Sequence, residues 1–325
     1  MDEITKVATA FGASLIITLL LGPFLIPLLY RLKFGQEVRG DGPRSHLQKR
    51  GTATMGGLMI LTGAALASFV TAGQTPEILL FLGIMLGCGL LGFADDFLKV
   101  VLRRPLGLKA RMKISGQLIL GLLLGWGSLL LGRDTSIVLP LADLTLDIGF
   151  SYIIFSVIVL VAATNAVNLT DGLDGLASGL MVIVSLAYIL IAWMTGENQA
   201  AIFAAALAGS CLGFLRYNYH PARVFMGDTG SLALGGGLAG LAVLTRTELV
   251  LLITGGVFVL ETLSVIIQVI SFRLTGRRIF LMSPLHHHFE LKGWSEVNVV
   301  FFFWLLGLFF AILGLLAMRG LGRSV

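Results

Sequence analysis

Charged residues are scarce in this chain: Asp, Glu, Lys and Arg make up only 13% of its 325 residues, whereas 56% are hydrophobic. Soluble domains carry about 25% charged residues, so the composition excludes an ordinary soluble protein. Cysteine is rarer still. The only two, Cys88 and Cys211, both lie inside apolar stretches, and we interpret them as small buried residues and not as a disulfide.

Several motifs are also missing. The chain has no Gly-Lys dipeptide, which argues against the phosphate-binding loop of an ATPase, and no His-Glu-x-x-His motif, which argues against that zinc site. No internal repeat is evident, so little favours a transporter built from related halves. The N-terminus starts with Met1, Asp2 and Glu3 before a long apolar run. A secretory signal would start with basic residues, so we expect a retained first helix.

Long apolar stretches dominate what is present. A helix that crosses a bilayer needs about twenty apolar residues. Ten stretches meet this requirement: 6–31, 54–74, 76–95, 114–132, 150–169, 176–195, 199–216, 230–246, 249–274 and 296–319. Their short joins leave no room for a soluble domain. We therefore predict one integral-membrane domain over residues 1–325, an all-α polytopic bundle of about ten transmembrane helices.

The basic residues indicate the orientation of this bundle. The segments 31–53, 96–113, 216–229 and 273–295 hold 18 of the 23 Lys and Arg residues. Because Lys and Arg concentrate in cytoplasmic loops, these segments are predicted to be cytoplasmic and both termini to lie outside. The net charge of +5 then reflects topology and anionic lipid, and we expect no nucleic-acid partner.

Five aspartates lie on the same predicted face. They are Asp95 and Asp96 in GFADDFLK, Asp171 and Asp174 in NLTDGLDG, and Asp228 in FMGDTGS. Ionisable groups at membrane depth tend to mark function. Acidic groups also suit Mg²⁺, which usually keeps oxygen ligands from substrate phosphates. The sequence thus predicts an intramembrane enzyme that handles phosphate at its cytoplasmic face.

Simpler interpretations of these segments stay open. Asp95 could form an interfacial salt bridge with Lys99, four residues later on the same helical face. The 168–175 segment could be a polar turn in which Asp171 caps the start of a helix. Phe225 could stack on a nucleobase or be an interfacial aromatic.

Two further segments on this face are basic or rich in histidine. Lys49, Thr52 and Thr54 precede a Gly-Gly pair in KRGTATMGG, which suits either a phosphate or lipid headgroups. MSPLHHHFELKGWSE holds three consecutive histidines, which cannot all face one metal in regular structure. We therefore favour histidines that bind a diphosphate over a zinc site.

Taken together, five segments in their order resemble the phospho-N-acetylmuramoyl-pentapeptide transferases, within the polyprenyl-phosphate sugar-1-phosphate transferases. The segments are SHLQKRGTATMGG, GFADDFLK, NAVNLTDGLDGLASG, RYNYHPARVFMGDTGS and SPLHHHFELKGWSE. Ala53 departs from the proline usual in that family. The PLHHHFE loop speaks against the alternative, a transferase that uses a UDP-N-acetylhexosamine donor.

The resemblance implies an Mg²⁺-dependent transfer of phospho-MurNAc-pentapeptide from UDP to undecaprenyl phosphate in the bacterial inner membrane. The products would be lipid I and UMP, a step of peptidoglycan synthesis, and the family suggests a homodimer. Asp95, Asp96 and Asp228 match the catalytic aspartates, with Asp228 at the metal position. The matched substrate-binding residues are Lys49, Thr54, Lys99, Lys113, Asn168, Asp171, Asp174, Asn218, Phe225, His286 and His287. Direct attack by the lipid phosphate is favoured over a covalent aspartyl intermediate, and Glu261 receives no catalytic role.

Overall fold

A computed structural model describes residues 2–32, 49, 51–104, 106–140 and 144–318. The part of the SHLQKRGTATMGG segment that covers residues 45–48 and Arg50 lies outside these residues. So do the far end of the tenth predicted span, at 319, and the rest of the C-terminus.

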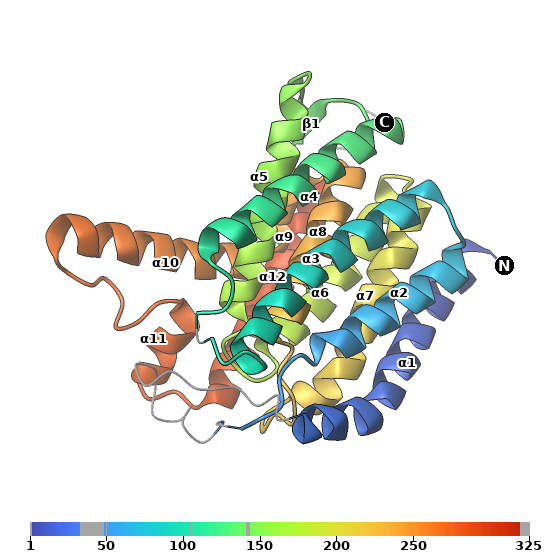
Figure 1. Ribbon diagram of the computed structural model, residues 1–325. Helices are drawn as coiled ribbons and strands as arrows, with labels where there is room; N and C mark the ends of the chain where they lie inside the picture. Colours follow the sequence, from blue (N-terminus) through green and yellow to red (C-terminus); the bar gives the residue numbers. More distant parts are fainter. Residues whose placement is uncertain (1, 33–48, 50, 105, 141–143, 319–325) are drawn as a thin grey trace.

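The described chain is a bundle of helices with one small hairpin (Figure 1). The helices that coincide with single predicted stretches are α1 (Glu3–Arg31), α2 (Gly57–Ala72), α3 (Pro76–Val100), α4 (Ala110–Leu130), α5 (Ser151–Thr170), α6 (Leu176–Met194), α7 (Asn198–Asn218), α8 (Gly227–Leu244) and α12 (Glu296–Ala317). The ninth stretch forms two helices, α9 (Glu248–Thr254) and α10 (Gly256–Thr275), and α11 (Leu285–Leu291) follows. The prediction of an all-α polytopic membrane protein is confirmed.

Eight of the helices in the described ranges are long and apolar enough to cross a membrane. α2, with 16 residues, and α8, with 18, fall outside this group. The predicted count of ten spans therefore stays a prediction. The break between α9 and α10 lies at Gly255, and Gly256 packs so closely on Phe310 that a Cβ there would be 2.5 Å from the ring. Beyond the break, α10 projects away from the other helices in Figure 1.

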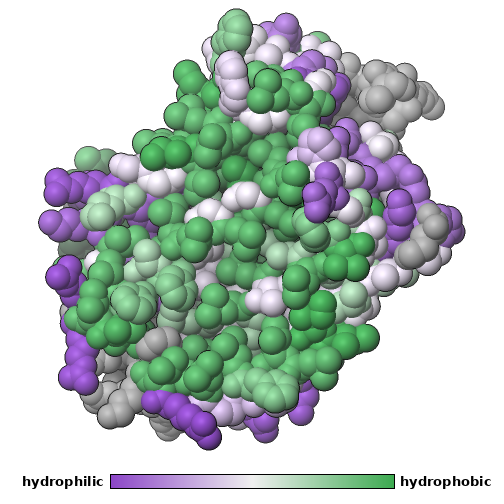
Figure 2. Space-filling view, turned by 45° about the vertical axis from the view of Figure 1, so that its right-hand side comes forward, coloured by the Kyte–Doolittle hydropathy of each residue, from purple (hydrophilic) through white to green (hydrophobic). Residues whose placement is uncertain are grey.

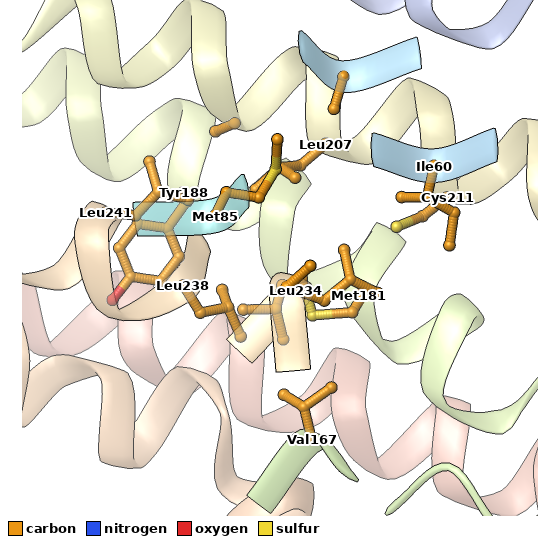
Figure 3. Close-up of a cluster of buried hydrophobic side chains, with 14 of the residues drawn as sticks. Ile60, Met85, Val167, Met181, Tyr188, Leu207, Cys211, Leu234, Leu238 and Leu241 are labelled. Carbon is orange, nitrogen blue, oxygen red and sulfur yellow. The ribbon is translucent and has the colours of Figure 1, made fainter. Parts of the chain in front are cut away.

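α8 lies at the centre of the bundle. All its residues from Thr229 to Leu244 are buried, and Leu234, Leu238 and Leu241 point into the core drawn in Figure 3. Glycine permits this burial at Gly92 of α3, where a Cβ would be 2.0 Å from the carbonyl oxygen of Asp228. The close approach of α3 to α8 fixes where their polar ends meet.

The opposite end of the bundle carries the hairpin, in which β1 (Ser136–Leu139) pairs antiparallel with β2 (Leu144–Asp147). There the buried Arg133 guanidinium lies 2.6 Å from the Glu248 carboxylate and 4.0 Å from the centre of the Tyr152 ring. Between the ends, the face shown in Figure 2 carries a broad apolar surface with hydrophilic residues at its margins. This pattern is that of a protein surrounded by lipid at mid-height.

Candidate active site

Three carboxylates meet where α3 ends and α8 begins. Asp95 and Asp96 are buried in the last part of α3, and Asp228 is the second residue of α8. Oxygens from all three lie within 4.8 Å of one another. The residues far apart in sequence are therefore brought together as the sequence predicted.

Asp96 supports the start of α8. Its carboxylate accepts hydrogen bonds from the Asp228 N–H at 3.1 Å, the Thr229 N–H at 2.9 Å and the Thr229 hydroxyl at 2.6 Å. The first N–H groups of a helix have no partner within the helix. The negative charge of an acidic side chain there also interacts favourably with the positive end of the helix dipole. Asp96 thus fixes the backbone that carries Asp228.

Asp228 is held by three polar side chains. Lys113 Nζ and Lys99 Nζ lie 2.7 and 3.1 Å from its Oδ2, and Asn168 donates to its Oδ1 at 2.9 Å. Asp95 forms an ion pair with Lys99 and accepts from the Leu108 N–H at 2.8 Å. The Asp95–Lys99 salt bridge that the sequence left open is present, as one contact of a larger charged network that includes Asp228.

The segment after Lys49 runs beside the segment that precedes α8. Ala53 and Val224 form a parallel bridge, in which the Phe225 N–H donates to the Ala53 carbonyl at 2.8 Å. This pairing brings Thr54 to Gly227, whose φ is +70° and where a Cβ would be 2.5 Å from the Asp96 carboxylate. Only glycine suits that conformation and that space.

A second charged cluster lies beside Phe225. Lys49 Nζ is 6.0 Å from the centre of the Phe225 ring and 2.7 Å from Asp174 Oδ1. Asp174 also accepts a hydrogen bond from His220 Nδ1 at 3.0 Å. Glu296 forms an ion pair with Lys49 and accepts a hydrogen bond from the Asp174 N–H. Glu296 and His220 were not among the predicted site residues. The position of Glu296, an acid at the start of the last predicted span on the same face, was the available signal.

The 168–175 segment distributes its polar groups in different directions. Asn168 bonds Asp228, whereas Asp174 bonds Lys49 and His220. Asp171 caps the C-terminal end of α5, so its interpretation as an N-cap is wrong. Burial, with a smaller effect from the nearby charges of Asp228 and other aspartates, raises the pKa of Asp171 well above its usual range.

Asn218 is buried against this segment. Its Oδ1 accepts from the Gly175 N–H at 3.1 Å and from the Ser178 hydroxyl at 2.9 Å, while its Nδ2 donates to the Val224 carbonyl at 3.0 Å. The contacts join the 168–175 segment to the segment that precedes α8. Asn218 therefore supports two site segments at once.

The consecutive histidines lie on the short helix α11. His286 is fully buried, 3.2 Å from the Glu261 carboxylate of α10. His287 Nδ1 is 2.8 Å from Glu290 Oε2. In the described ranges, two groups of three or more side chains could hold a metal ion, Asp95–Asp96–Asp228 and Asp174–His220–Glu296, and neither contains these histidines.

Comparison with known proteins gives the family. Residues 78–246 match glycosyl transferase family 4. A phospho-N-acetylmuramoyl-pentapeptide-transferase of Moorella thermoacetica is 57% identical over 301 residues, covering 92% of this chain and 95% of that protein. Proteins of the same name from Desulforudis audaxviator and Desulfitobacterium hafniense are 54% and 52% identical over 97% and 96% of this chain. The chain belongs to the phospho-N-acetylmuramoyl-pentapeptide transferase family.

Proposed function

We propose that this protein transfers phospho-MurNAc-pentapeptide from UDP-MurNAc-pentapeptide to undecaprenyl phosphate. An oxygen of the lipid phosphate attacks the sugar-bearing phosphorus, and the bond from that phosphorus to the UMP oxygen breaks. The products are lipid I and UMP. The observation that carries the proposal is the network of Asp95, Asp228, Lys99 and Lys113 at one end of an apolar bundle, in a chain of this family.

The two lysines supply positive charge at the proposed reaction site. Transfer of a phosphoryl group depends mainly on positioning and on neutralising charge. Lys99 and Lys113 place two ammonium groups within 3.1 Å of Asp228. There they can neutralise part of the negative charge of the donor's diphosphate. Lys99 is the more exposed of the two, with 36% of its side chain accessible against 18% for Lys113.

The carboxylates also fit Mg²⁺, because oxygen ligands from Asp suit this ion and three of them converge here. Asp228 would hold it, with Asp95 beside it. When bound, the ion supplies positive charge to the diphosphate oxygens. Asp96 is less suited, since its oxygens are engaged by the first residues of α8.

Asp95 is proposed as the base that accepts a proton from the lipid phosphate. The second ionisation of a phosphate monoester has a pKa of about 6, so little proton transfer is required at neutral pH. The lipid phosphate is therefore nucleophilic enough to attack directly, and we favour this route over one with a covalent aspartyl intermediate. The buried position of Asp95, oriented by the Leu108 N–H, suits a fixed acceptor.

The nucleoside half of the donor is assigned to the neighbouring segments. Phe225 offers a ring face, and Lys49 lies between this ring and Asp174 of the 168–175 segment, which also carries Asp171. For the acceptor, an apolar cavity of about 260 Å³ extends between α5, α9 and α10, with Val167, the neighbour of Asn168, in its lining. It is proposed to take the prenyl chain from the bilayer.

The site faces the cytoplasm of a bacterial inner membrane in this proposal, since its segments hold most of the basic residues. A homodimer is proposed from the family alone. Purified protein should convert UDP-MurNAc-pentapeptide and undecaprenyl phosphate to lipid I and UMP only when Mg²⁺ is present. UDP-N-acetylglucosamine should not replace the donor. Equal turnover of the two donors would contradict the proposed specificity.

A further inference from the structure

A buried carboxylate and a buried histidine face each other outside the aspartate network. Glu261 lies within α10, one of the helices apolar enough to cross a membrane, and it is fully buried. His286, on α11, is equally buried. Glu261 Oε2 and His286 Nδ1 are 3.2 Å apart, a distance that joins the two helices through one polar contact.

The Glu261 carboxylate and the His286 ring have no other hydrogen-bond partners among the described residues. Within the described ranges, neither Glu261 oxygen and neither ring nitrogen of His286 has a well-formed hydrogen bond. Ser264, one turn along α10, donates to the Glu261 backbone carbonyl and not to its carboxylate. A buried carboxylate without a partner costs several kcal/mol, so the Glu261 carboxylate is expected to accept a hydrogen bond from the nearest donor. That donor is His286 Nδ1.

The other ring nitrogen of His286 faces the 168–175 segment. A Cβ on Gly172 would lie 2.2 Å from His286 Nε2. The imidazole therefore extends from a carboxylate of α10 on one side to the backbone between Asp171 and Asp174 on the other. Because Gly172 has no side chain, the ring packs directly on the loop backbone, where Nε2 is buried and, within the described ranges, has no hydrogen-bond partner.

We infer that Glu261 is a positioning residue that holds His286 through Nδ1 so that Nε2 points to the UDP-sugar donor beside Gly172. The inference rests on the proposed function. A histidine with two possible tautomers binds a ligand through one defined nitrogen only when the other nitrogen is fixed. Glu261 supplies that fixed contact from inside the membrane-spanning part of the chain.

A set of four variants tests the inference: Glu261→Met, Glu261→Gln, His286→Ala and the double variant Glu261→Met/His286→Ala. Binding of UDP-MurNAc-pentapeptide is measured by calorimetry in the presence of Mg²⁺, without acceptor. The matched control is Ser264→Ala, which changes a buried polar side chain of α10 whose hydroxyl donates to a backbone carbonyl. Each variant is first checked for a monodisperse elution profile and a cooperative thermal transition.

We expect Glu261→Met and His286→Ala each to weaken donor binding on the order of tenfold, the size of one hydrogen bond to a charged ligand. The double variant should be no weaker than either single variant, since both remove the same contact. Glu261→Gln should stay within about threefold of the parent, because the amide oxygen can still accept from Nδ1. Ser264→Ala should bind normally.

Three results would overturn the inference. One is additive losses in the double variant, and another is an effect of Glu261→Gln as large as that of Glu261→Met. The third is a Glu261→Met protein that binds the donor normally and changes only the KM for undecaprenyl phosphate, which would place Glu261 in the lipid groove instead. Because calorimetry requires no turnover, a parent protein that binds the donor but forms no lipid I would refute the proposed function without refuting the Glu261–His286 relation.

The tautomer gives a second measurement. In protein with ¹⁵N-labelled histidine, the signals that disappear in His286→Ala identify this residue. The parent and Glu261→Gln should both show a protonated Nδ1, whereas Glu261→Met should shift the proton between the two nitrogens. Unchanged ¹⁵N shifts in Glu261→Met would contradict the role of Glu261.

Discussion

Asp96 of α3 accepts the backbone N–H of Asp228 at 3.1 Å, so one aspartate of the site holds another in place. The contact crosses two helices that are also brought close by Gly92. It gives the adjacent aspartates of GFADDFLK different tasks: Asp95 stays with the lysines, and Asp96 stabilises the start of α8.

This division predicts that Asp96→Ala loses stability as well as activity. Removal of a helix cap costs about 1 kcal/mol, and here two backbone donors and the Thr229 hydroxyl lose their acceptor. The melting temperature of the purified protein should therefore fall. Thr229→Val, which removes only the hydroxyl donor, should lower it less. An Asp96→Ala protein that melts with the parent would contradict the capping role.

Phe225 and Asp95 should separate binding from chemistry. Stacking of a base on an aromatic side chain is worth about 1–3 kcal/mol, so Phe225→Ala should weaken UDP binding by about 5- to 150-fold. Asp95→Asn should bind UDP nearly normally and lose turnover, because the base acts only when the lipid phosphate attacks. Calorimetry with UDP on both variants measures the difference. Unchanged affinity in Phe225→Ala, or lost affinity in Asp95→Asn, would mean that the roles are wrongly assigned.

The orientation can be tested with single cysteines at exposed positions. Leu106→Cys and Leu291→Cys lie on the predicted cytoplasmic side, and Thr145→Cys lies in the hairpin. Both native cysteines are buried and should give little background. In intact cells an impermeant thiol reagent should label only Thr145→Cys. Labelling of Leu106→Cys instead would place the site on the outer face.

The ion pair at the hairpin end should matter for stability and not for catalysis. Arg133→Met leaves the buried Glu248 carboxylate without its guanidinium, and breaking a buried pair in this way costs about 3–5 kcal/mol. The double variant Arg133→Met/Glu248→Gln should recover part of the lost melting temperature. Activity per folded molecule should be unchanged in Arg133→Met, because Arg133 does not line the cavity proposed for the prenyl chain. A double variant less stable than Arg133→Met would contradict this explanation.

The sequence predicted the helices well because a membrane span is a local property. Each of the ten apolar stretches is helical over most of its described residues, and the three aspartate segments meet at one end. The hairpin at 136–147 was not predicted, since strands of four residues leave too short a pattern. The break at Gly255 was not located either, because glycine is frequent throughout the chain and packing against Phe310 is a tertiary contact.

Within the site, residue types were easier to predict than partners. Asp228 was predicted at the metal position, but Lys99 and Lys113 could be matched to it only by the fold. The N-cap interpretation of Asp171, which the sequence left open, is wrong because an aspartate before glycine suits either end of a helix. Glu296 and Glu261 depend on contacts with Lys49 and His286 across more than 20 residues of sequence, which no local pattern reveals.

The central claim is that Asp228 and its lysines form a metal-dependent phosphoryl-transfer site, and one assay tests it most directly. Formation of lipid I and UMP from UDP-MurNAc-pentapeptide and undecaprenyl phosphate is measured across an Mg²⁺ titration for the parent, Asp228→Ala and Asp147→Ala. Asp147 is an exposed aspartate of the hairpin and serves as the matched control. The account predicts Mg²⁺-dependent turnover in the parent and in Asp147→Ala, and none in a folded Asp228→Ala protein. Turnover in Asp228→Ala that still rises with Mg²⁺ to near the parent rate would contradict it.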